Sequence, residues 1–387
     1  MPRTLSPRKF GRLPSLKPIL FPLIRASRGV PELISGSNRE LKMTFEDQLN
    51  VMVYFHLKDF QSGRHLLQDL QEDDFAKEFV APSGGIGKST FFDSLNERGL
   101  EQFLHVFQNL FKQASNQIPK KFSELGDLVA IDGSLIDSVL SMTWADYRKG
   151  SKKAKVHVGF NVNCSIPQKI FLTEGKGAER PFTQKILEPG QTGIMDRGYQ
   201  SHDLFDQWQA NDVHFVCRIK GNTQKTCIKE LPFDIGGIIF YDAVVRLGQT
   251  GINETKKELR LVGYKVGNKK YWVATDRFDL AAEQIALIYK LRWNVESFFA
   301  WWKRHMRVYH LISRSKHGLM IQILSGLITY LLLAIYCNSE FGEKVNIKRV
   351  RELQIKITNE IRQLNHEPPD LDPEKDSSKA TLSQANF

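Results

Sequence analysis

Four side chains in the C-terminal third of the sequence have types and a spacing that suit chemistry on phosphate. They are Tyr289, Arg292, Glu296 and Lys303. At about 100° per residue, an α-helix would place all four within an arc of roughly 60°. One helix face would then present a phenol, a guanidinium, a carboxylate and an ammonium group, and both cations suit phosphate oxygens. The same pattern also fits an exposed face of i, i+4 salt bridges, so the helix alone leaves both interpretations open.

Two aspartates upstream of this segment each follow an apolar run. Asp132 follows the β-type run 128–131, and Asp196 follows the apolar pair 194–195. A carboxylate at the end of a buried strand points into the crevice at the sheet edge, where active sites form. The alternative is that each aspartate is a turn residue or a helix cap. Together with Glu296 the two could hold two Mg²⁺ ions, one activating a water or 3′-hydroxyl and one stabilising the leaving 3′ oxygen.

The segments around these residues predict a mixed α/β core. A helix is expected at 202–210, and strands are indicated at 128–131, 155–162, 169–173 and 213–219. Residues of about 222–275 are strand-like with Gly and Asn at the turns, so we interpret them as a β-rich insertion in the core. Long helices are expected at about 279–307, 317–337 and 346–364.

Two regions precede this core. Residues 1–43 contain nine Lys or Arg against two acids, so this basic arm could follow DNA phosphates or form a solvated tail. Residues 44–120 have a helical pattern that begins at Thr44, with Asp47 three residues later. Short helices with a tight turn and basic residues predict a helical DNA-binding domain. No nucleotide is expected at the glycine-rich stretch 84–90, because Pro82 stands where a phosphate-binding loop needs its first glycine.

Together these residues resemble one family. Asp132 in Ile-Asp-Gly-Ser, Asp196 in Asp-Arg-Gly-Tyr, and the helix with Tyr289, Arg292, Glu296 and Lys303 resemble the Tyr-Arg-Glu-Lys group of bacterial insertion-sequence transposases, which carry a transposase DDE domain. The order and the separations of 64 and 100 residues fit, and the resemblance covers about residues 125–335. It implies an RNase H-like catalytic core interrupted by the β-rich insertion. It also implies cut-and-paste transposition by a homodimer that bridges two double-stranded DNA ends.

The resemblance implies roles for individual residues. Asp132, Asp196 and Glu296 would be the catalytic metal ligands for Mg²⁺, which Mn²⁺ could replace. The DNA contacts implied at backbone phosphates are Tyr289, Arg292 and Lys303, with Arg218 and Lys220 as further candidates. Trp272 would stack on a flipped base, the alternative being a tryptophan in a β-core. Trp293, Trp301 and Trp302 are expected to be packing residues.

Related enzymes release the element through a hairpin at its tip, and we expect this here. Two alternatives are a decayed transposase that binds DNA without cutting it, and an RNase H-like nuclease without strand transfer. The predicted boundaries are 1–43 for the basic arm, 44–120 for the helical domain, 121–221 and 276–340 for the two parts of the core, 222–275 for the insertion, and 341–387 for the C-terminal helix and tail.

Composition agrees with a nucleic-acid partner without deciding it. The net charge is +11 and the pI is near 9.3, which favours a polyanionic partner. The four cysteines form no Cys-x-x-Cys pair, and we expect buried thiols in the reducing bacterial cytoplasm, beside the nucleoid: Cys164, Cys217, Cys227 and Cys337. Residues 319–337 are apolar and just long enough to span a bilayer, with a buried core helix as the favoured interpretation and a membrane anchor as the alternative.

Overall fold

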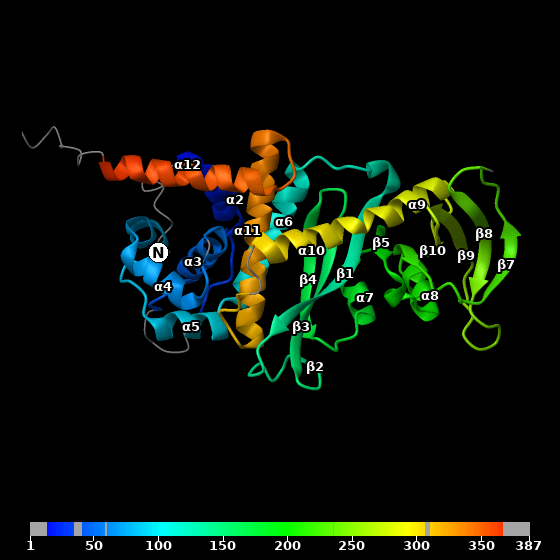
Figure 1. Cartoon of the computed structure of the whole chain (residues 1–387), viewed down its shortest axis with the longest axis horizontal. Coiled ribbons are helices and arrows are strands. Elements are labelled where there is room, and N and C mark those ends of the chain that lie inside the picture. Colours follow the sequence, from blue (N-terminus) through cyan, green and yellow to red (C-terminus); the bar gives the residue numbers. More distant parts are fainter. Residues whose placement is uncertain (1–13, 35–40, 59, 235, 306–309, 367–387) are drawn as a thin grey trace, which may run out of the picture.

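A ten-stranded mixed sheet extends from the middle of the molecule to its right-hand end in Figure 1. The computed structural model describes residues 14–34, 41–58, 60–234, 236–305 and 310–366. The strand order is β2-β3-β1-β5-β6-β10-β9-β8-β7, and β4 also pairs with β3. The pairs β1–β5 and β5–β6 are parallel, whereas the other pairs are antiparallel. The strands are β1 (Asp127–Ser138), β2 (Asp146–Arg148), β3 (Ser151–Asn161), β4 (Ile166–Glu174), β5 (Gln191–Met195), β6 (His214–Arg218), β7 (Lys225–Glu230), β8 (Ile239–Leu247), β9 (Leu259–Val266) and β10 (Lys269–Thr275).

The predicted strands are all present, and the short strands β2 and β7 were not predicted. The segment 222–275 continues the central sheet, because β10 pairs with β6 and places Val273 opposite Arg218. Residues 128–131 are fully buried, as expected for a strand covered on both faces. Their continuous apolar run is therefore a consequence of the position of β1 in the middle of the sheet.

Strand β1 is longer than predicted, and Asp132 lies inside it. The parallel pairing of β1 with β5 ends at Ala130, opposite Ile194. The antiparallel pairing with β3 continues to Ser138, opposite Lys152. The prediction that Asp132 ends its strand is therefore wrong. Asp132 lies just beyond the point where β1 loses β5 as a neighbour, so the sheet edge beside it is formed by the end of β5.

Helices cover the sheet and form a bundle beside it (Figure 1). The long helix α11 contacts α2, α3, α5 and α6, and Thr44 and Asp47 form the capping box that begins α3. The helices are η1 (Pro14–Leu16), α2 (Lys17–Ala26), α3 (Phe45–Leu57), α4 (Gly63–Glu72), η2 (Ala76–Val80), α5 (Lys88–Glu97), α6 (Leu100–Gln117), η3 (Ser123–Leu125), η4 (Arg180–Phe182), α7 (Thr183–Ile186), η5 (Arg197–Tyr199), α8 (His202–Ala210), α9 (Ala282–Leu291), α10 (Trp293–His305), α11 (Lys316–Phe341) and α12 (Ile347–His366).

Part of the predicted basic arm is folded. Helix α2 lies within residues 1–43 and buries Ile19, Leu23 and Ala26 against the bundle. Because these three residues recur at helical spacing, they form an apolar stripe that anchors α2 to the bundle. Residues 17–26 are therefore neither an extended arm nor a solvated tail. Residues 1–13 and 35–40 of the arm, and the predicted tail after 366, lie outside the described residues.

Helix α11 is the predicted core helix. It is long and apolar enough to cross a membrane, and 94% of its apolar window is buried within the protein. Three of the four cysteines are buried as expected, but Cys227 on β7 is exposed. The prediction of a buried thiol is wrong there, because every residue of β7 is exposed at the edge of the sheet.

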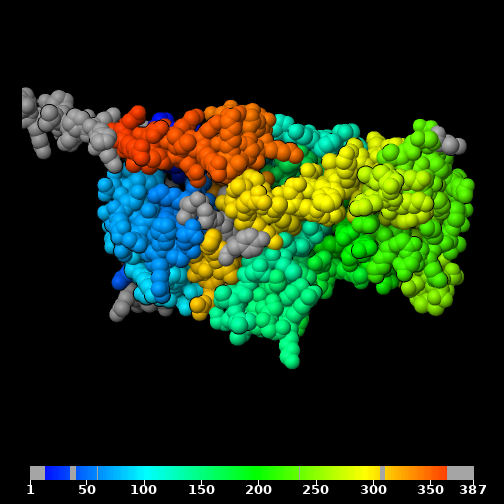
Figure 2. Space-filling view, viewed as in Figure 1, coloured from blue at the N-terminus to red at the C-terminus, as the bar shows by residue number. Residues whose placement is uncertain are grey.

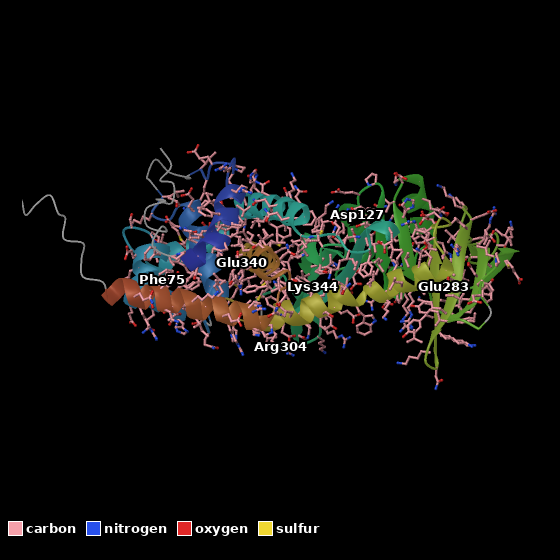
Figure 3. All side chains as sticks on the ribbon, turned by 90° about the horizontal axis from the view of Figure 1, so that it is seen from above. Phe75, Asp127, Glu283, Arg304, Glu340 and Lys344 are labelled. Carbon is pink, nitrogen blue, oxygen red and sulfur yellow. The ribbon has the colours of Figure 1, made fainter. Side chains whose placement is uncertain are left out.

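The predicted helix 279–307 consists of two helices. Helix α9 ends at Leu291, Arg292 is its C-cap, and α10 begins at Trp293. In the space-filling view the two, in yellow, form one ridge across the face of the molecule (Figure 2). Seen from above, α9, α10 and α12 follow one another along one edge (Figure 3).

Candidate active site

Asp132 is held at the edge where β1 leaves β5. Its Oδ1 atom accepts a hydrogen bond of 2.9 Å from the backbone N–H of Gly133. Burial raises the pKa of Asp132 to about 6, while the positive charge of Arg292 lowers it. The negative charges of Glu179 and Glu296 raise it further. Asp132 is thus a largely buried carboxyl group with other carboxylates as neighbours.

Asp196 directly follows β5 and caps η5. Its Oδ1 atom accepts a hydrogen bond of 2.6 Å from the backbone N–H of Arg197. The hydroxyl of Tyr289 donates to the same oxygen at 3.5 Å, and Nη1 of Arg218 lies 3.9 Å from it. The side chain of Asp196 is 41% exposed, so solvent or a ligand can reach it.

The four residues predicted to share one helix face all face this edge, although they lie on two helices. Nη2 of Arg292 lies 2.6 Å from Oε1 of Glu296, and Nε of Arg292 has no hydrogen-bond partner among the described residues. Tyr289 reaches Asp196. Nζ of Lys303 donates to the backbone carbonyl of Leu135 on β1 at 2.7 Å. The break at Arg292 does not separate the four, because its backbone remains helical.

The other DNA-contact candidates lie beside Asp196 and on the insertion. Arg218 ends β6, and its guanidinium lies 5.0 Å from the ring centroid of Tyr271. Trp272 on β10 is partly buried against the second core cluster, and Nζ of Lys225 lies 3.6 Å from its ring centroid. One face of Trp272 is therefore covered by a lysine, and the base-stacking role stays a prediction.

Trp293 does not pack as predicted. It is 62% exposed, whereas Trp302 is fully buried. The physical reason is the position of each residue on α10. The face that carries Val295, Phe298 and Trp302 lies against the core, and Trp293 lies off that stripe.

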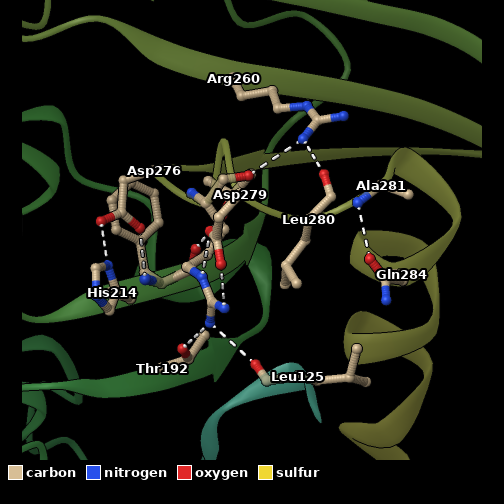
Figure 4. A network of polar contacts seen from close by, with 12 residues as sticks. Leu125, Thr192, His214, Arg260, Asp276, Asp279, Leu280, Ala281 and Gln284 are labelled. Carbon is tan, nitrogen blue, oxygen red and sulfur yellow. Dashed lines mark hydrogen bonds and ion pairs between the residues drawn. The ribbon is translucent and has the colours of Figure 1, made fainter.

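A buried polar network fixes the connection from β10 to α9 (Figure 4). Arg260 forms a bidentate pair with Asp242 and donates to the backbone carbonyls of Arg277 and Leu280. Arg277 in turn pairs with Asp279 and donates to Thr192 on β5. These bonds join the start of α9 to β5 and β9, so they set the position from which Tyr289 reaches Asp196.

Sequence reasoning missed three residues of the site. Glu179 lies beside Gly133, where a Cβ atom would meet its Oε1 at 2.9 Å. Lys155 on β3 pairs with Glu179 at 3.2 Å, and Tyr199 is buried among the carboxylates. The only sequence signal was Tyr199, the last residue of Asp-Arg-Gly-Tyr. Glu179 and Lys155 stand in no motif and reach the site only through the pairing of β3 with both β1 and β4.

Comparison with known proteins identifies the domain that carries this arrangement. The transposase DDE domain family matches residues 124–332, which include Asp132, Asp196 and Glu296. The chain belongs to this family. It therefore carries a DDE transposase domain, the catalytic domain of DNA transposases.

Two relatives of this DDE transposase domain come from bacteria. The chain is 27% identical over 195 residues to a probable transposase for insertion sequence element IS5377 of Geobacillus stearothermophilus, over 50% of this chain and 52% of that protein. It is 24% identical over 284 residues to a putative transposase for insertion sequence element IS4SA of Synechocystis, over 70% and 78%. The chain therefore spans about half the length of the first relative and most of the second.

Two further comparisons extend over more of the chain. A putative transposase, y4zB, of Sinorhizobium fredii is 24% identical over 310 residues, which cover 78% of this chain and 86% of that protein. Among solved structures, the piggyBac transposase synaptic complex with hairpin DNA matches 99% of this chain and 84% of its own, with 13% identity and a TM-score of 0.44.

The carboxylates of the DDE transposase domain are the type of ligand that a divalent cation needs. All the proposed ligand atoms are oxygens, which Mg²⁺ prefers. Burial beside other carboxylates raises the pKa of Asp132 to about 6, so an added cation would relieve charge repulsion there. Within the described residues, no three acidic, His or Cys side chains are close enough together to hold a metal ion. Glu296 is instead paired with Arg292, so this pair must rearrange before Glu296 can join the other ligands.

Proposed function

We propose that this chain is an insertion-sequence transposase of the Tyr-Arg-Glu-Lys group, which binds the ends of its element and performs cut-and-paste transposition. The observation that carries the proposal is the convergence of Tyr289, Arg292, Glu296 and Lys303 from α9 and α10 on Asp132 and Asp196. A helix face that carried only solvent-exposed salt bridges would not lie against Asp132 and Asp196 at the sheet edge. The family membership supports the same reaction class.

The fold supports an RNase H-like catalytic core. In β4-β3-β1-β5-β6, antiparallel strands lie on one side of β1 and parallel strands on the other. The strands β7 to β10 would then be the β-rich insertion between Asp196 and Glu296. The domain boundaries at 120, 221, 275 and 340 are proposed on this basis, with the bundle of helices before residue 120 as the DNA-binding domain.

The proposed mechanism of DNA cleavage and joining depends on three carboxylates and four contacts to phosphate. Asp132, Asp196 and Glu296 would hold two Mg²⁺ ions, which activate the attacking hydroxyl group and stabilise the leaving oxygen when they are bound. Four further side chains would contact backbone phosphates around the cut: Tyr289, Arg292, Lys303 and Arg218. Arg292 bonds Glu296 through Nη2 alone, and a guanidinium has further N–H donors, so Arg292 could hold a phosphate and Glu296 together once DNA reaches it.

The partner in this proposal is double-stranded DNA, at the inverted repeats of the element and at its target. The net charge of +11 supports a polyanionic partner. We further propose that a homodimer bridges the two ends, that the element is released through a hairpin, and that the protein acts on nucleoid DNA in the cytoplasm.

Cleavage of a linear DNA carrying the element with its own flanking ends tests the proposal. With Mg²⁺, the wild type is expected to cut at the ends and to join them to a target. Glu296→Ala is expected to bind the same DNA without cutting. Equal cutting by both proteins would remove Glu296 from the active site. Cutting without joined products would favour a nuclease, and specific binding without cutting by the wild type would favour a decayed transposase.

A further inference from the structure

A fourth carboxylate, that of Glu179, lies beside Asp132. Glu179 precedes η4, in the connection that returns from β4 to β5. Its Oε1 atom lies so close to the Cα of Gly133 that a Cβ atom there would be 2.9 Å away. The glycine after Asp132 thus leaves the space that the Glu179 carboxylate occupies. This contact joins Glu179 to the residue that follows a proposed cation ligand.

One lysine side chain pairs with the Glu179 carboxylate at this place. Nζ of Lys155 lies 3.2 Å from its Oε1 atom and also donates to the backbone carbonyl of Gly177 at 3.0 Å. The Lys155 side chain is 15% exposed, so this pair is less screened by solvent than a surface salt bridge. The Glu179 side chain is 31% exposed and remains accessible to an ion.

The segment that carries Glu179 is attached to the sheet on both sides. Nε of Arg180 donates to the backbone carbonyl of Gly198, in the segment after Asp196, at 3.1 Å. The ring of Phe182 stacks on His157 of β3, with 4.2 Å between the centroids. Glu179 is therefore positioned by the same two elements, β3 and η5, that lie beside the proposed ligands.

A buried hydroxyl group lies beside the Glu179 carboxylate. Tyr199 is 1% exposed, and its hydroxyl has no partner at normal hydrogen-bond geometry among the described residues. After burial, the charges of Glu179, Asp132 and Asp196 and a loose hydrogen bond to Glu179 raise the pKa of Tyr199, so the phenol lies among all three carboxylates. Buried donors normally have a well-placed acceptor, and a small shift of Glu179 would bring this contact to normal geometry.

We propose that Glu179 is a cation ligand of this active site and shares the ion with Asp132. The inference rests on the proposed function, since it assumes that the domain binds divalent cations. Mg²⁺ is commonly held by one or two carboxylates while it keeps several waters, so Asp132 and Glu179 suffice for one ion before DNA arrives. In this state Glu296 would keep its pair with Arg292, which the structure contains at 2.6 Å.

Binding of Mn²⁺ to the full chain without DNA, measured by electron paramagnetic resonance of the free ion, tests the proposal. Glu179→Gln is expected to weaken the binding by about tenfold or more. The matched control is Glu188→Gln, because Glu188 forms a similar pair, with Lys169 at 2.8 Å, and is not expected to affect Mn²⁺. Thermal unfolding of both variants shows whether they are folded. A folded Glu179→Gln variant with wild-type Mn²⁺ affinity would overturn the proposal.

Lys155→Met separates ligation from packing. It removes the ion pair but keeps the carboxylate, so its affinity for Mn²⁺ is expected to equal or exceed that of the wild type. A loss of Mn²⁺ affinity as large as that of Glu179→Gln would mean that the ion pair only shapes the site, and the proposal would be wrong.

Asp132→Asn distinguishes a failure of the proposed function from a failure of the proposal about Glu179. End cleavage that survives this substitution sinks the proposed function itself, whereas its loss, with Glu179→Gln binding Mn²⁺ normally, removes only Glu179.

Discussion

Nη2 of Arg292 lies 2.6 Å from Oε1 of Glu296, and the same guanidinium is the largest influence that lowers the pKa of Asp132 against the effect of burial. One arginine is therefore shared by two of the three proposed cation ligands. It provides the positive charge that a bound cation would provide, and a cation must compete with it. Arg292 is also one of the proposed phosphate contacts, so the two roles can be separated by experiment.

Arg292→Ala is expected to change DNA cleavage and metal binding in opposite directions. Cleavage of element ends should fall about 100-fold, because a preorganised positive group at the reacting phosphate is lost. Mn²⁺ binding without DNA should become tighter, because the competing charge is gone. Cleavage kinetics and Mn²⁺ titration measure the two effects. Arg304→Ala, on the exposed side of α10, is the control and should change neither, and weaker Mn²⁺ binding by Arg292→Ala would contradict the shared-arginine interpretation.

Asp132→Asn is expected to stabilise the metal-free protein at pH 7.5. The pKa of Asp132 is raised to about 6, chiefly by burial, so the folded protein prefers the protonated form. As pH rises from about 4 to about 6, the unfolded chain ionises first and stability is lost; above that range the loss is constant. The variant should therefore gain about 1–3 kcal/mol at pH 7.5 and little at pH 4. Urea denaturation at the two pH values measures this, and an equal gain at both would exclude ionisation as the cause.

Trp272→Ala is expected to reduce the capture of an unstacked base beside the cut. Base–aromatic stacking contributes about 1–3 kcal/mol, and Lys225 must move from the ring to expose it. Fluorescence of 2-aminopurine next to the cleavage site reports the unstacked base, and Trp272→Phe should retain part of the signal. Trp293→Ala, an exposed tryptophan on α10, serves as the control. A signal unchanged by Trp272→Ala would leave Trp272 as a core residue of the insertion.

Asp242→Asn is expected to destabilise the fold by about 3–5 kcal/mol, because it leaves the charge of Arg260 buried without its partner. The two side chains are 1% and 7% exposed. Glu352→Gln, which breaks the exposed pairs of Glu352 with Lys348 and Arg349 on α12, should cost less than about 1 kcal/mol. Denaturant unfolding compares the two. If the two variants lose similar stability, the buried Asp242–Arg260 pair stabilises the fold no more than a surface pair does.

Local patterns accounted for much of the fold and of the site. Apolar residues recur every two residues along a strand and about every 3.6 residues along a helix, and both patterns can be read within a single element. Most strands, the core helix α11 and the shared face of Tyr289, Arg292, Glu296 and Lys303 were therefore predictable. Boundaries were less predictable. The extension of β1 beyond Asp132 depends on its pairing with β3, and the helix break at Arg292 carries no Pro or Gly signal.

The sequence by itself determined the proposed catalytic carboxylates and their order, because the types and spacing of Asp132, Asp196 and Glu296 are properties of the chain. Only the tertiary structure decided which other charges surround them. Glu179 lies beside Gly133 because β1, β3 and β4 pair in one register. Arg292 faces both Glu296 and Asp132 because α9 and α10 cross that edge. Charges act through space, so the neighbours that set the chemistry of a carboxylate follow from packing between distant segments.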